Sequence, residues 1–288
     1  MSKANVLFDE PGPQGRRRIV VATVGVLAVA AAVVAAAVWQ FGRSGQLAAG
    51  QWSPFTQGYI VNVIWQGMEG TLRATVVAVL ISFPLGALVG LMRVSVFTPV
   101  RVVARIYVEF FRSIPLLLLI YFFLLVLPFW SVNLPIFWKL VAPIILTNVA
   151  ILAEVFRAGI GALDRGQFEA AEAVGMRRTQ MMRLVVLPQV IRLLVPALVN
   201  GLITVLKDTT LGYVVSYPEL MRTAQNITAS LHLLIQTYLI AALIYVVVNA
   251  LLSQLAHYLE RRLSHSRQSG RSAGAVGNAE EKIAVAMR

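Results

Sequence analysis

Residues 166–188 read GQFEAAEAVGMRRTQMMRLVVLP and separate two long apolar segments. The part up to Val174 is rich in strong helix formers, and Glu169 stands early, where the helix dipole favours an acidic side chain. Gly175 is suited to end that helix, because glycine adopts the left-handed backbone of a C-terminal cap without steric cost. The stretch therefore predicts a short surface helix, a turn, and a second helix that leads into an apolar span.

Apolar segments long enough to cross a bilayer lie on both sides of this stretch. Spanning about 30 Å of hydrocarbon takes roughly 20 helical residues. Six segments of about that length occur, at residues 19–39, 74–92, 113–129, 140–156, 184–206 and 233–256. Since hydrophobic residues make up 58% of the chain and charged residues only 13%, we expect an all-α membrane protein with about six transmembrane helices.

The basic residues divide unevenly between the two sides that these spans define. If the N-terminus is cytoplasmic, the outer loops hold only Arg43, Lys139, Lys207 and Arg222, and most other basic residues face inward. Cytoplasmic loops of membrane proteins carry such an excess of positive charge. The pattern predicts that both termini and residues 166–188 are cytoplasmic.

The composition also excludes several classes of function. The chain has no cysteine and only three scattered histidines, so neither a thiolate nucleophile nor a metal site is expected. Its net charge of +12 follows the cytoplasmic loops and forms no basic face interleaved with aromatic residues, as nucleic-acid binding would require. No GxxxxGK(S/T) phosphate loop occurs, so we expect no catalytic residue and no ATP hydrolysis by this chain.

Six positions in the opening stretch have a spacing that is specific when taken together: Glu169, Ala170, Ala171, Gly175, Leu187 and Pro188. They resemble the EAA motif of the permease subunits of bacterial ABC importers. The resemblance implies the type I importer fold, with five core helices and here an extra N-terminal helix. It also implies that the motif forms a coupling helix, which seats in a groove of the ATPase subunit. An ordinary Ala-rich loop would not need the complete spacing through Pro188.

Three further groups of residues are similar to the polar-amino-acid branch of these permeases, the histidine, glutamine and glutamate type. They are Arg112, Ile114, Pro115 and Leu116; Asn148, Ala153, Glu154, Arg157, Gly159 and Ile160; and Asn200, Leu206, Lys207, Asp208, Thr209, Thr210 and Leu211. The similarity covers about residues 67–258. It implies import of a polar amino acid by alternating access, with glutamate as the best guess and a basic or amide side chain still open.

The domain organisation follows from the spans and the resemblance. We expect a cytoplasmic segment at residues 1–18 and an extra transmembrane helix at 19–41, which is longer than the roughly 7 to 15 apolar residues of a secretory signal. The importer domain should occupy 67–260, with its cytoplasmic coupling loop at 158–183. Residues 261–288 are largely polar and without apolar periodicity, which predicts a disordered cytoplasmic tail.

The resemblance also implies partners and a location. A cytoplasmic ABC ATPase dimer would bind ATP and magnesium, so the permease itself would hold no cofactor. A second permease chain, identical or paralogous, would complete the path. An extracytoplasmic amino-acid-binding protein would deliver the solute, because the outer loop at 42–70 is too short for a binding domain. The expected location is the bacterial inner, or plasma, membrane.

Six polar residues in the fourth and fifth spans or at the outer end of the fifth are candidates for the substrate pathway: Asn148, Glu154, Asn200, Lys207, Asp208 and Thr209. Ionisable groups within a span are costly in lipid and face a partner, a cavity or a pathway. Glu154 shares a helix face with Arg157, so a structural ion pair is an equal alternative. The two asparagines can instead bond between helices, and residues 207–209 can form a solvated helix end.

Two other functions stay open at this point. One is an ion-gradient-driven secondary transporter of a small polar solute, and the other is a membrane scaffold that transports nothing. The first predicts paired acidic residues at mid-membrane or an inverted repeat, and the sequence shows neither. The second requires only a loop that binds a helical partner.

Overall fold

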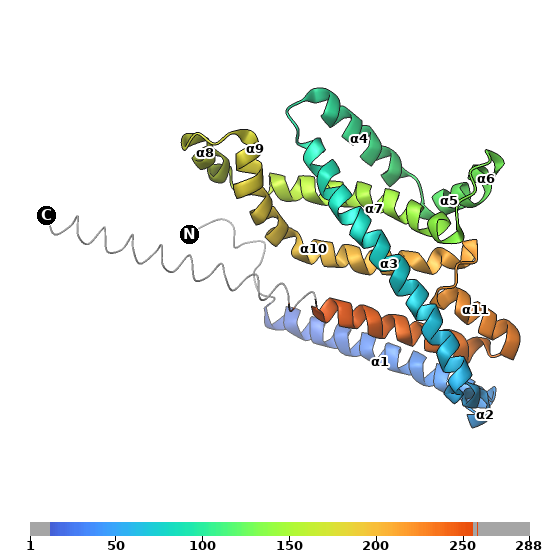
Figure 1. The fold of residues 1–288 in the computed structure, drawn as a ribbon. Coiled ribbons are helices and arrows are strands. Elements are labelled where there is room, and N and C mark those ends of the chain that lie inside the picture. Colours follow the sequence, from blue (N-terminus) through green and yellow to red (C-terminus); the bar gives the residue numbers. More distant parts are fainter. Residues whose placement is uncertain (1–11, 256–257, 259–288) are drawn as a thin grey trace. The chain divides into compact units, whose positions relative to one another are not determined.

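The computed structural model describes residues 12–255 and 258 of the chain. The chain divides into two units, Met1–Ile60 and Val61–Arg288, and Figure 1 labels their helices. The tail expected at residues 261–288 and most of the segment expected at 1–18 lie outside the described part.

One long helix, α1 (Pro13–Arg43), dominates the smaller unit and is followed by α2 (Ala49–Trp52) and a 3-10 helix, Ser53–Thr56. The apolar side chains of α1 are exposed within this unit along the whole helix. At its end, the Arg43 guanidinium lies 4.7 Å from the centre of the Trp39 ring. A long helix with its apolar groups uncovered is what a lipid-facing span requires.

The larger unit contains most of the helices. Its first half consists of α3 (Gly58–Arg93), whose first turn falls in the smaller unit, α4 (Thr98–Ser113), α5 (Leu116–Tyr121), α6 (Leu127–Phe129) and α7 (Ile136–Gly161). Its second half consists of α8 (Arg165–Ala173), α9 (Arg178–Met181), α10 (Leu187–Asp208), α11 (Leu220–Leu231) and a last helix, Leu234–Leu255. Short 3-10 and π-helical segments join several of them, and the described residues contain no strand.

Within the described residues, five helices are long and apolar enough to cross a membrane: Gln14–Arg43, Gly58–Arg93, Ile136–Gly161, Arg178–Val215 and Leu234–Leu255. A sixth candidate is the pair Thr98–Ser113 and Leu116–Phe129, whose two helices are bent by 96°. The expectation of an all-α membrane protein with about six spans is confirmed.

The second span begins earlier than the sequence predicted. α3 starts at Gly58 rather than near residue 74, so Arg73 lies well inside the helix. Glu69 and Arg73 are exposed charged residues that interrupt the apolar run, and they hid the first half of the helix from a search for uncharged segments. The Arg73 guanidinium lies 5.5 Å from the centre of the Phe137 ring of α7. A cation–π contact of this kind offsets part of the cost of placing a charge in the span.

The third span is broken where the sequence predicted one run from 113 to 129. Ile114 precedes Pro115, and a proline ring disfavours the helical conformation of the residue before it. Ile114 accordingly has an extended backbone, with φ −92° and ψ 124°, between α4 and α5. The sharp bend of this pair follows from that one step.

Two π-helical segments, Phe122–Val126 and Met182–Val186, each end two residues before a proline, Pro128 and Pro188. A proline inside a helix has no N–H to donate, and its ring crowds the carbonyl group four residues earlier. In both cases that carbonyl lies within the π-helical segment, where the wider turn accommodates it. The helices therefore continue through these prolines.

α7 is more buried than the other spans, and α3 and α10 approach it closely at glycines. A Cβ added at Gly90 of α3 would lie 2.7 Å from the Cβ of Phe156 in α7, and Gly86 makes the same kind of approach one turn earlier. On the other side, a Cβ added at Gly159 of α7 would lie 2.8 Å from the Leu194 side chain of α10. Small residues at helix crossings let backbones pack closely in membranes. α3, α7 and α10 thus form the framework of the larger unit.

A buried carboxyl group, Glu219, holds the start of α11. Its two oxygen atoms accept hydrogen bonds from the backbone N–H groups of Met221, at 2.7 Å, and Arg222, at 2.6 Å. The hydroxyl group of Tyr245, on the last helix, donates to it at 3.0 Å. Glu219 is fully buried, so these hydrogen bonds replace the ones that its carboxyl group would make to water.

α3 completes this joint. Its Thr71 hydroxyl oxygen accepts a hydrogen bond from the backbone N–H of Leu220 at 3.1 Å, and the Tyr217 hydroxyl donates to the Gly70 carbonyl at 3.1 Å. Gly70 lies so close to the carbonyl of Pro218 that an added Cβ would overlap it. α3, α11 and the last helix are therefore held together beside one carboxyl group.

We expect the free energy of unfolding to fall as the pH rises through the range in which Glu219 loses its proton. Burial raises the pKa of Glu219 from 4.5 to about 7. Between these values the folded state binds more protons than the unfolded state. Stability present below about pH 4.5 is therefore lost by about pH 7, in an amount on the order of 2 to 3 kcal/mol.

The variant Glu219→Gln isolates this contribution, because its side chain does not titrate. Its melting temperature in detergent should fall less between about pH 5 and about pH 8 than that of the unaltered chain. At low pH the variant should be less stable than the unaltered chain by about 1–3 kcal/mol. Its amide has one oxygen in place of two, so its NH2 group would face a backbone N–H and leave that donor without an acceptor. Equal pH slopes for the two proteins would show that Glu219 does not titrate as proposed.

Candidate functional site

The opening stretch forms two short helices joined by a turn, as predicted. α8 begins after Asp164, whose Oδ1 accepts a hydrogen bond from the backbone N–H of Gly166 at 2.8 Å. This bond satisfies one of the N–H groups that a helix start leaves free. At the start of α9 the capping side chain lies inside the helix: Gln180 Oε1 accepts a hydrogen bond from the backbone N–H of Arg177, the residue before α9, at 2.9 Å.

α8 ends in a turn that requires glycine. Gly175 has a φ of +73°, in the left-handed region. Its N–H donates to the Glu172 carbonyl at 2.9 Å, and the Met176 N–H donates to the Ala171 carbonyl at 3.1 Å. These two bonds are the Schellman form of a C-terminal cap. Gly175 therefore ends the helix as the sequence predicted.

One face of α8 is buried against the larger unit. Ala171 is only 4% exposed and Phe168 is half-buried, and both pack in one apolar cluster with Met181, Val186 and Val190. Burial of apolar side chains on one face is what holds so short a helix in place, since an isolated helix of this length is not stable. α8 is thus anchored through its underside.

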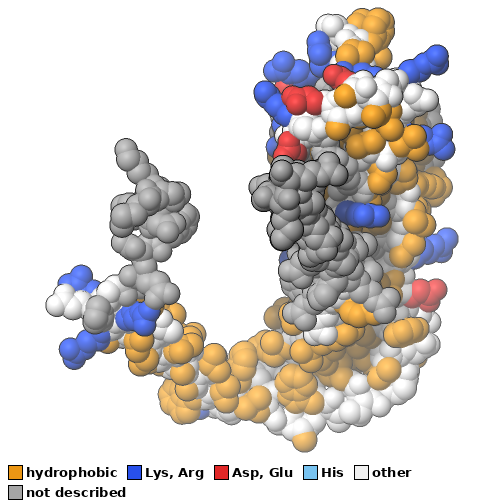
Figure 2. Space-filling view, turned by 90° about the vertical axis from the view of Figure 1, so that its left-hand side faces the viewer, with side chains coloured by type: hydrophobic (Ala, Val, Ile, Leu, Met, Phe, Trp, Pro, Cys, Tyr) orange, Lys and Arg blue, Asp and Glu red, His pale blue; other side chains and the backbone are white. Residues whose placement is uncertain are grey.

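The opposite face of α8 presents Glu169, Ala170, Glu172 and Ala173 to solvent. At the end of the helix Val174 is 73% exposed. Small side chains allow a partner to approach the helix backbone closely, and the two carboxylates flank that approach. Figure 2, which looks onto this side of the larger unit, shows Lys and Arg side chains gathered around it.

Two side-chain hydrogen bonds fasten the segment to other helices. Gln189 Nε2 of α10 donates to Gln167 Oε1 of α8 at 3.0 Å. The Arg178 guanidinium of α9 donates to the carbonyl of Val94, just after α3, at 3.4 Å. The segment is therefore linked to two of the three framework helices.

Leu187 and Pro188 lie apart from the exposed face of α8. They are the first two residues of α10 and follow the π-helical segment Met182–Val186. Leu187 is half-buried and Pro188 is exposed. The structure thus divides the six motif residues between the α8 segment and its joint with a span.

Among the pathway candidates, the structure brings Asn148 and Asp208 together. Asn148 of α7 is only 1% exposed, and its amide interacts with the Asp208 carboxylate at the end of α10. The same amide donates a hydrogen bond to the carbonyl of Ile144 at 3.2 Å. Asn148 and Asp208 therefore lie near each other where α7 passes the end of α10.

The remaining candidates on α10 and just after it differ in exposure. Thr209 is fully buried, and its hydroxyl donates to the carbonyl of Leu206 at 2.7 Å. Asn200 and Lys207 are exposed, and in the described part of the chain neither side chain makes a hydrogen bond or an ion pair. These two side chains are free to contact a solute or a second chain.

Glu154 belongs to an ion-pair cluster near the end of α7. Arg157 Nε donates to Glu154 Oε1 at 2.8 Å, so the predicted pair within the helix forms. Arg93, the last residue of α3, makes a second ion pair with Glu154, with 3.2 Å between Nη2 and Oε2. The sequence did not single out Arg93, because only the packing of α3 on α7 brings the two residues together.

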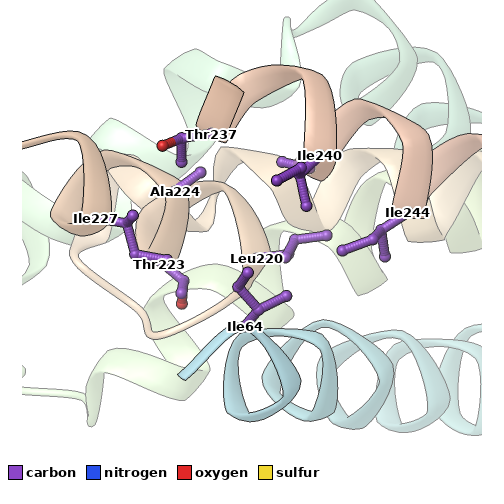
Figure 3. Close-up of a pocket in the computed structure, with 9 residues that line it drawn as sticks. Ile64, Leu220, Thr223, Ala224, Ile227, Thr237, Ile240 and Ile244 are labelled. Carbon is purple, nitrogen blue, oxygen red and sulfur yellow. The ribbon is translucent and has the colours of Figure 1, made fainter. Parts of the chain in front are cut away.

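A narrow pocket lies between α3, α11 and the last helix (Figure 3). Its lining is almost wholly apolar: Ile64, Leu220, Thr223, Ala224, Ile227, Thr237, Ile240, Ala241 and Ile244. The Thr237 hydroxyl is already bonded to the carbonyl of Leu233, at 2.7 Å. A polar solute would lose its hydration here without replacement, so we assign the pocket to helix packing.

A membrane subunit of a transporter is the class that this fold and the anchored α8 segment define. Residues 82–265 match the family described as binding-protein-dependent transport system inner membrane component. The chain belongs to that family, and it is an ABC-importer permease subunit rather than an enzyme.

The relatives with assigned names are permeases of amino-acid transporters. It is 36% identical over 200 residues to the probable glutamine ABC transporter permease protein GlnM of Bacillus subtilis (strain 168), covering 69% of this chain and 93% of the relative. It is 32% identical over 228 residues to the glutamate transport system permease protein GluD of Corynebacterium glutamicum, covering 78% and 84%. A solved structure of an amino acid ABC transporter with histidines is 35% identical, with a TM-score of 0.67 over 70% of this chain and 94% of that one.

We expect Gly175→Val to loosen the turn after α8 and Gly175→Asn to leave it nearly intact. A branched side chain in the left-handed region costs roughly 1–2 kcal/mol, whereas asparagine tolerates it. Tryptic cleavage after Arg177 and Arg178 should then be about 5 to 30 times faster in the valine variant. Equal cleavage rates in the two variants would contradict the requirement for glycine.

Proposed function

We propose that this chain imports a polar amino acid, and glutamate is our best guess for the solute. Relatives are named for glutamine, for glutamate and, at 36% identity, for glutamate/aspartate. Another relative, 35% identical, is named for arginine. The names agree on polar amino acids and differ in the charge of the side chain. Uptake assays of the reconstituted complex with glutamate, glutamine and arginine decide among them.

We further propose that α8 is the coupling helix through which a separate ATPase drives the chain. The observation that carries this proposal is the division of α8 into an anchored face with Ala171 and an open face with Glu169 and Ala170. A groove of the partner would receive the alanines and Val174, and Glu169 would meet a cation of the partner. The glycine turn fixes the direction of that face.

Through its buried face, α8 would transmit its own movement to two spans, α7 and α10. The apolar cluster beneath α8 includes Phe156 and Ile160 of α7 together with Val190 and Leu194 of α10. Because protein interiors are close-packed, α8 cannot shift without displacing these neighbours. ATP binding would then favour one orientation of α7 and α10 over another, which is what alternating access needs.

Three partners would join this chain in the complete transporter. An ATPase dimer would hold ATP and magnesium, a second permease chain, identical or paralogous, would face this one, and an extracytoplasmic binding protein would deliver the amino acid. The excess of basic residues on the loops beside α8 supports placing both termini in the cytoplasm of a bacterial cell. The domains would be the importer domain at 67–260, the extra helix at 19–41, and cytoplasmic ends at 1–18 and 261–288.

Reversing the charge of Glu169 tests the coupling proposal. In a complex reconstituted with its ATPase and binding protein, Glu169→Arg should lower solute-stimulated ATP hydrolysis by about ten-fold or more, because an attractive contact becomes a repulsive one. Glu169→Gln should retain an intermediate rate. Membrane insertion of both variants should be normal, since Glu169 is exposed.

Gln57→Arg serves as the matched control. It adds the same side chain at another exposed position, outside α8, and should leave stimulation unchanged. Co-purification of the ATPase with each variant shows whether a lower rate of ATP hydrolysis comes from weaker binding of the ATPase or from a bound ATPase that is no longer stimulated. Normal stimulation in Glu169→Arg would rule out α8 as the point of coupling.

A further inference from the structure

One side of α10 is polar along most of its length. Four residues on this side have exposed polar side chains, and we call them the polar stripe: Arg192, Asn200, Thr204 and Lys207. Residues four apart, and the last pair three apart, are neighbours on a helix surface, so the stripe follows one face. Val190, Leu194 and Val205, on the opposite side of α10, are buried. The stripe therefore points away from the core of the larger unit.

The polar stripe extends over much of the depth of the hydrocarbon layer. From Arg192 to Lys207 the helix rises about 22 Å, against about 30 Å for the layer. Both residues belong to the span Arg178–Val215. Pro196 lies between them on the same face and has no N–H to donate to the carbonyl of Arg192, which adds a backbone acceptor to this side.

Lipid is a poor cover for this stripe. In the part of the chain that the structure describes, the side chains of Arg192, Asn200 and Lys207 make no hydrogen bond or ion pair. The Thr204 hydroxyl is satisfied within the helix, because it donates to the carbonyl of Asn200 at 2.9 Å. Ionisable groups within a span are costly in lipid, so they face a partner or a water-filled cavity. The stripe therefore faces water or a second chain.

The charges of the stripe favour water over a packed second chain. Arg192 and Lys207 are both cations, and the stripe contains no acid. Asp208 follows Lys207 but points about 100° away from it, and it lies half-buried near Asn148 of α7. An identical chain packed directly against the stripe would bring only cations to meet cations, which repel each other in every register. Water between the chains removes that conflict.

We infer that the polar stripe lines a water-filled path, and that Lys207 makes this path selective for amino acids with a net negative charge. In the proposed orientation Lys207 stands at the outer end, where an arriving solute meets it first. The Asn200 amide, about two turns deeper, can donate a hydrogen bond to a carboxylate.

The selectivity follows from the charge of the solute. Glutamate carries one negative charge more than its amide, glutamine, and is attracted more strongly by a lysine. The identity of the solute rests on the proposed function, because only a chain that conducts amino acids presents them to the stripe. The existence of a water-filled path does not depend on it.

Thiol labelling tests the path without requiring transport. The chain has no cysteine, so Asn200→Cys introduces a single thiol into the stripe. Leu243→Cys is the matched control, because Leu243 is 63% exposed on the last helix among exposed apolar side chains such as Leu239 and Val246. In proteoliposomes of the assembled complex, a charged methanethiosulfonate should modify Asn200→Cys about ten times faster than Leu243→Cys or more, since the reactive thiolate forms in water and not in lipid.

Reagents of opposite charge test the selectivity. Relative to a free thiol in solution, an anionic sulfonatoethyl reagent should react with Asn200→Cys about three to ten times faster than a cationic trimethylammonium reagent. Adding Lys207→Gln should lower this ratio by about two-fold or more, and it should lower the ratio of glutamate to glutamine uptake by a similar factor. Lys139→Gln removes the same charge near the start of α7 and should leave both ratios unchanged.

Equal labelling of Asn200→Cys and Leu243→Cys would overturn the water-filled path. Ratios that Lys207→Gln leaves unchanged, or that Lys139→Gln lowers equally, would overturn the selectivity. Uptake by the unaltered complex separates these results from the proposed function. If it takes up neither glutamate, glutamine nor arginine, the proposed function fails, whereas the labelling rates still decide whether the stripe faces water.

Discussion

The close approach of α3 and α10 to α7 is the constraint on which the rest of the larger unit depends. Lipid is as apolar as a leucine side chain, so helices in a membrane gain little from burial and must gain from contact. Gly86 and Gly90 on one side and Gly159 on the other permit that contact. The same packing sets Arg93 against Glu154 and places the start of α10 under α8. The anchoring of α8 and the Arg93–Glu154 ion pair therefore both follow from the glycine positions.

The end of α7 belongs to both an apolar and a charged cluster. Phe156 and Ile160 belong to the apolar cluster that anchors α8, and Glu154 and Arg157 hold the charged cluster a short way along the same helix. A movement of α8 that displaced the end of α7 would therefore also alter the spacing of the arginines.

Some features were predictable from the sequence because they depend on local chemistry. The glycine turn after α8, the Glu154–Arg157 pair and most of the spans follow from spacing alone. Other features depend on contacts between distant segments. The role of Arg93 needs the packing of α3 on α7, and the buried Glu219 needs Tyr245 from the last helix. The first half of α3 was missed because charges at its surface resemble a loop in a search for apolar runs.

We propose that energy enters this chain through the exposed face of α8 on the cytoplasmic side. The chain contains no cysteine, so Val174→Cys introduces a single thiol at the exposed end of that helix. Labelling of this thiol by a membrane-impermeant maleimide, in inside-out vesicles with and without the bound ATPase, tests the claim directly. We expect rapid labelling of the free permease and protection of the thiol by the bound ATPase. Unprotected labelling in the assembled complex, or labelling from outside intact cells, would contradict it.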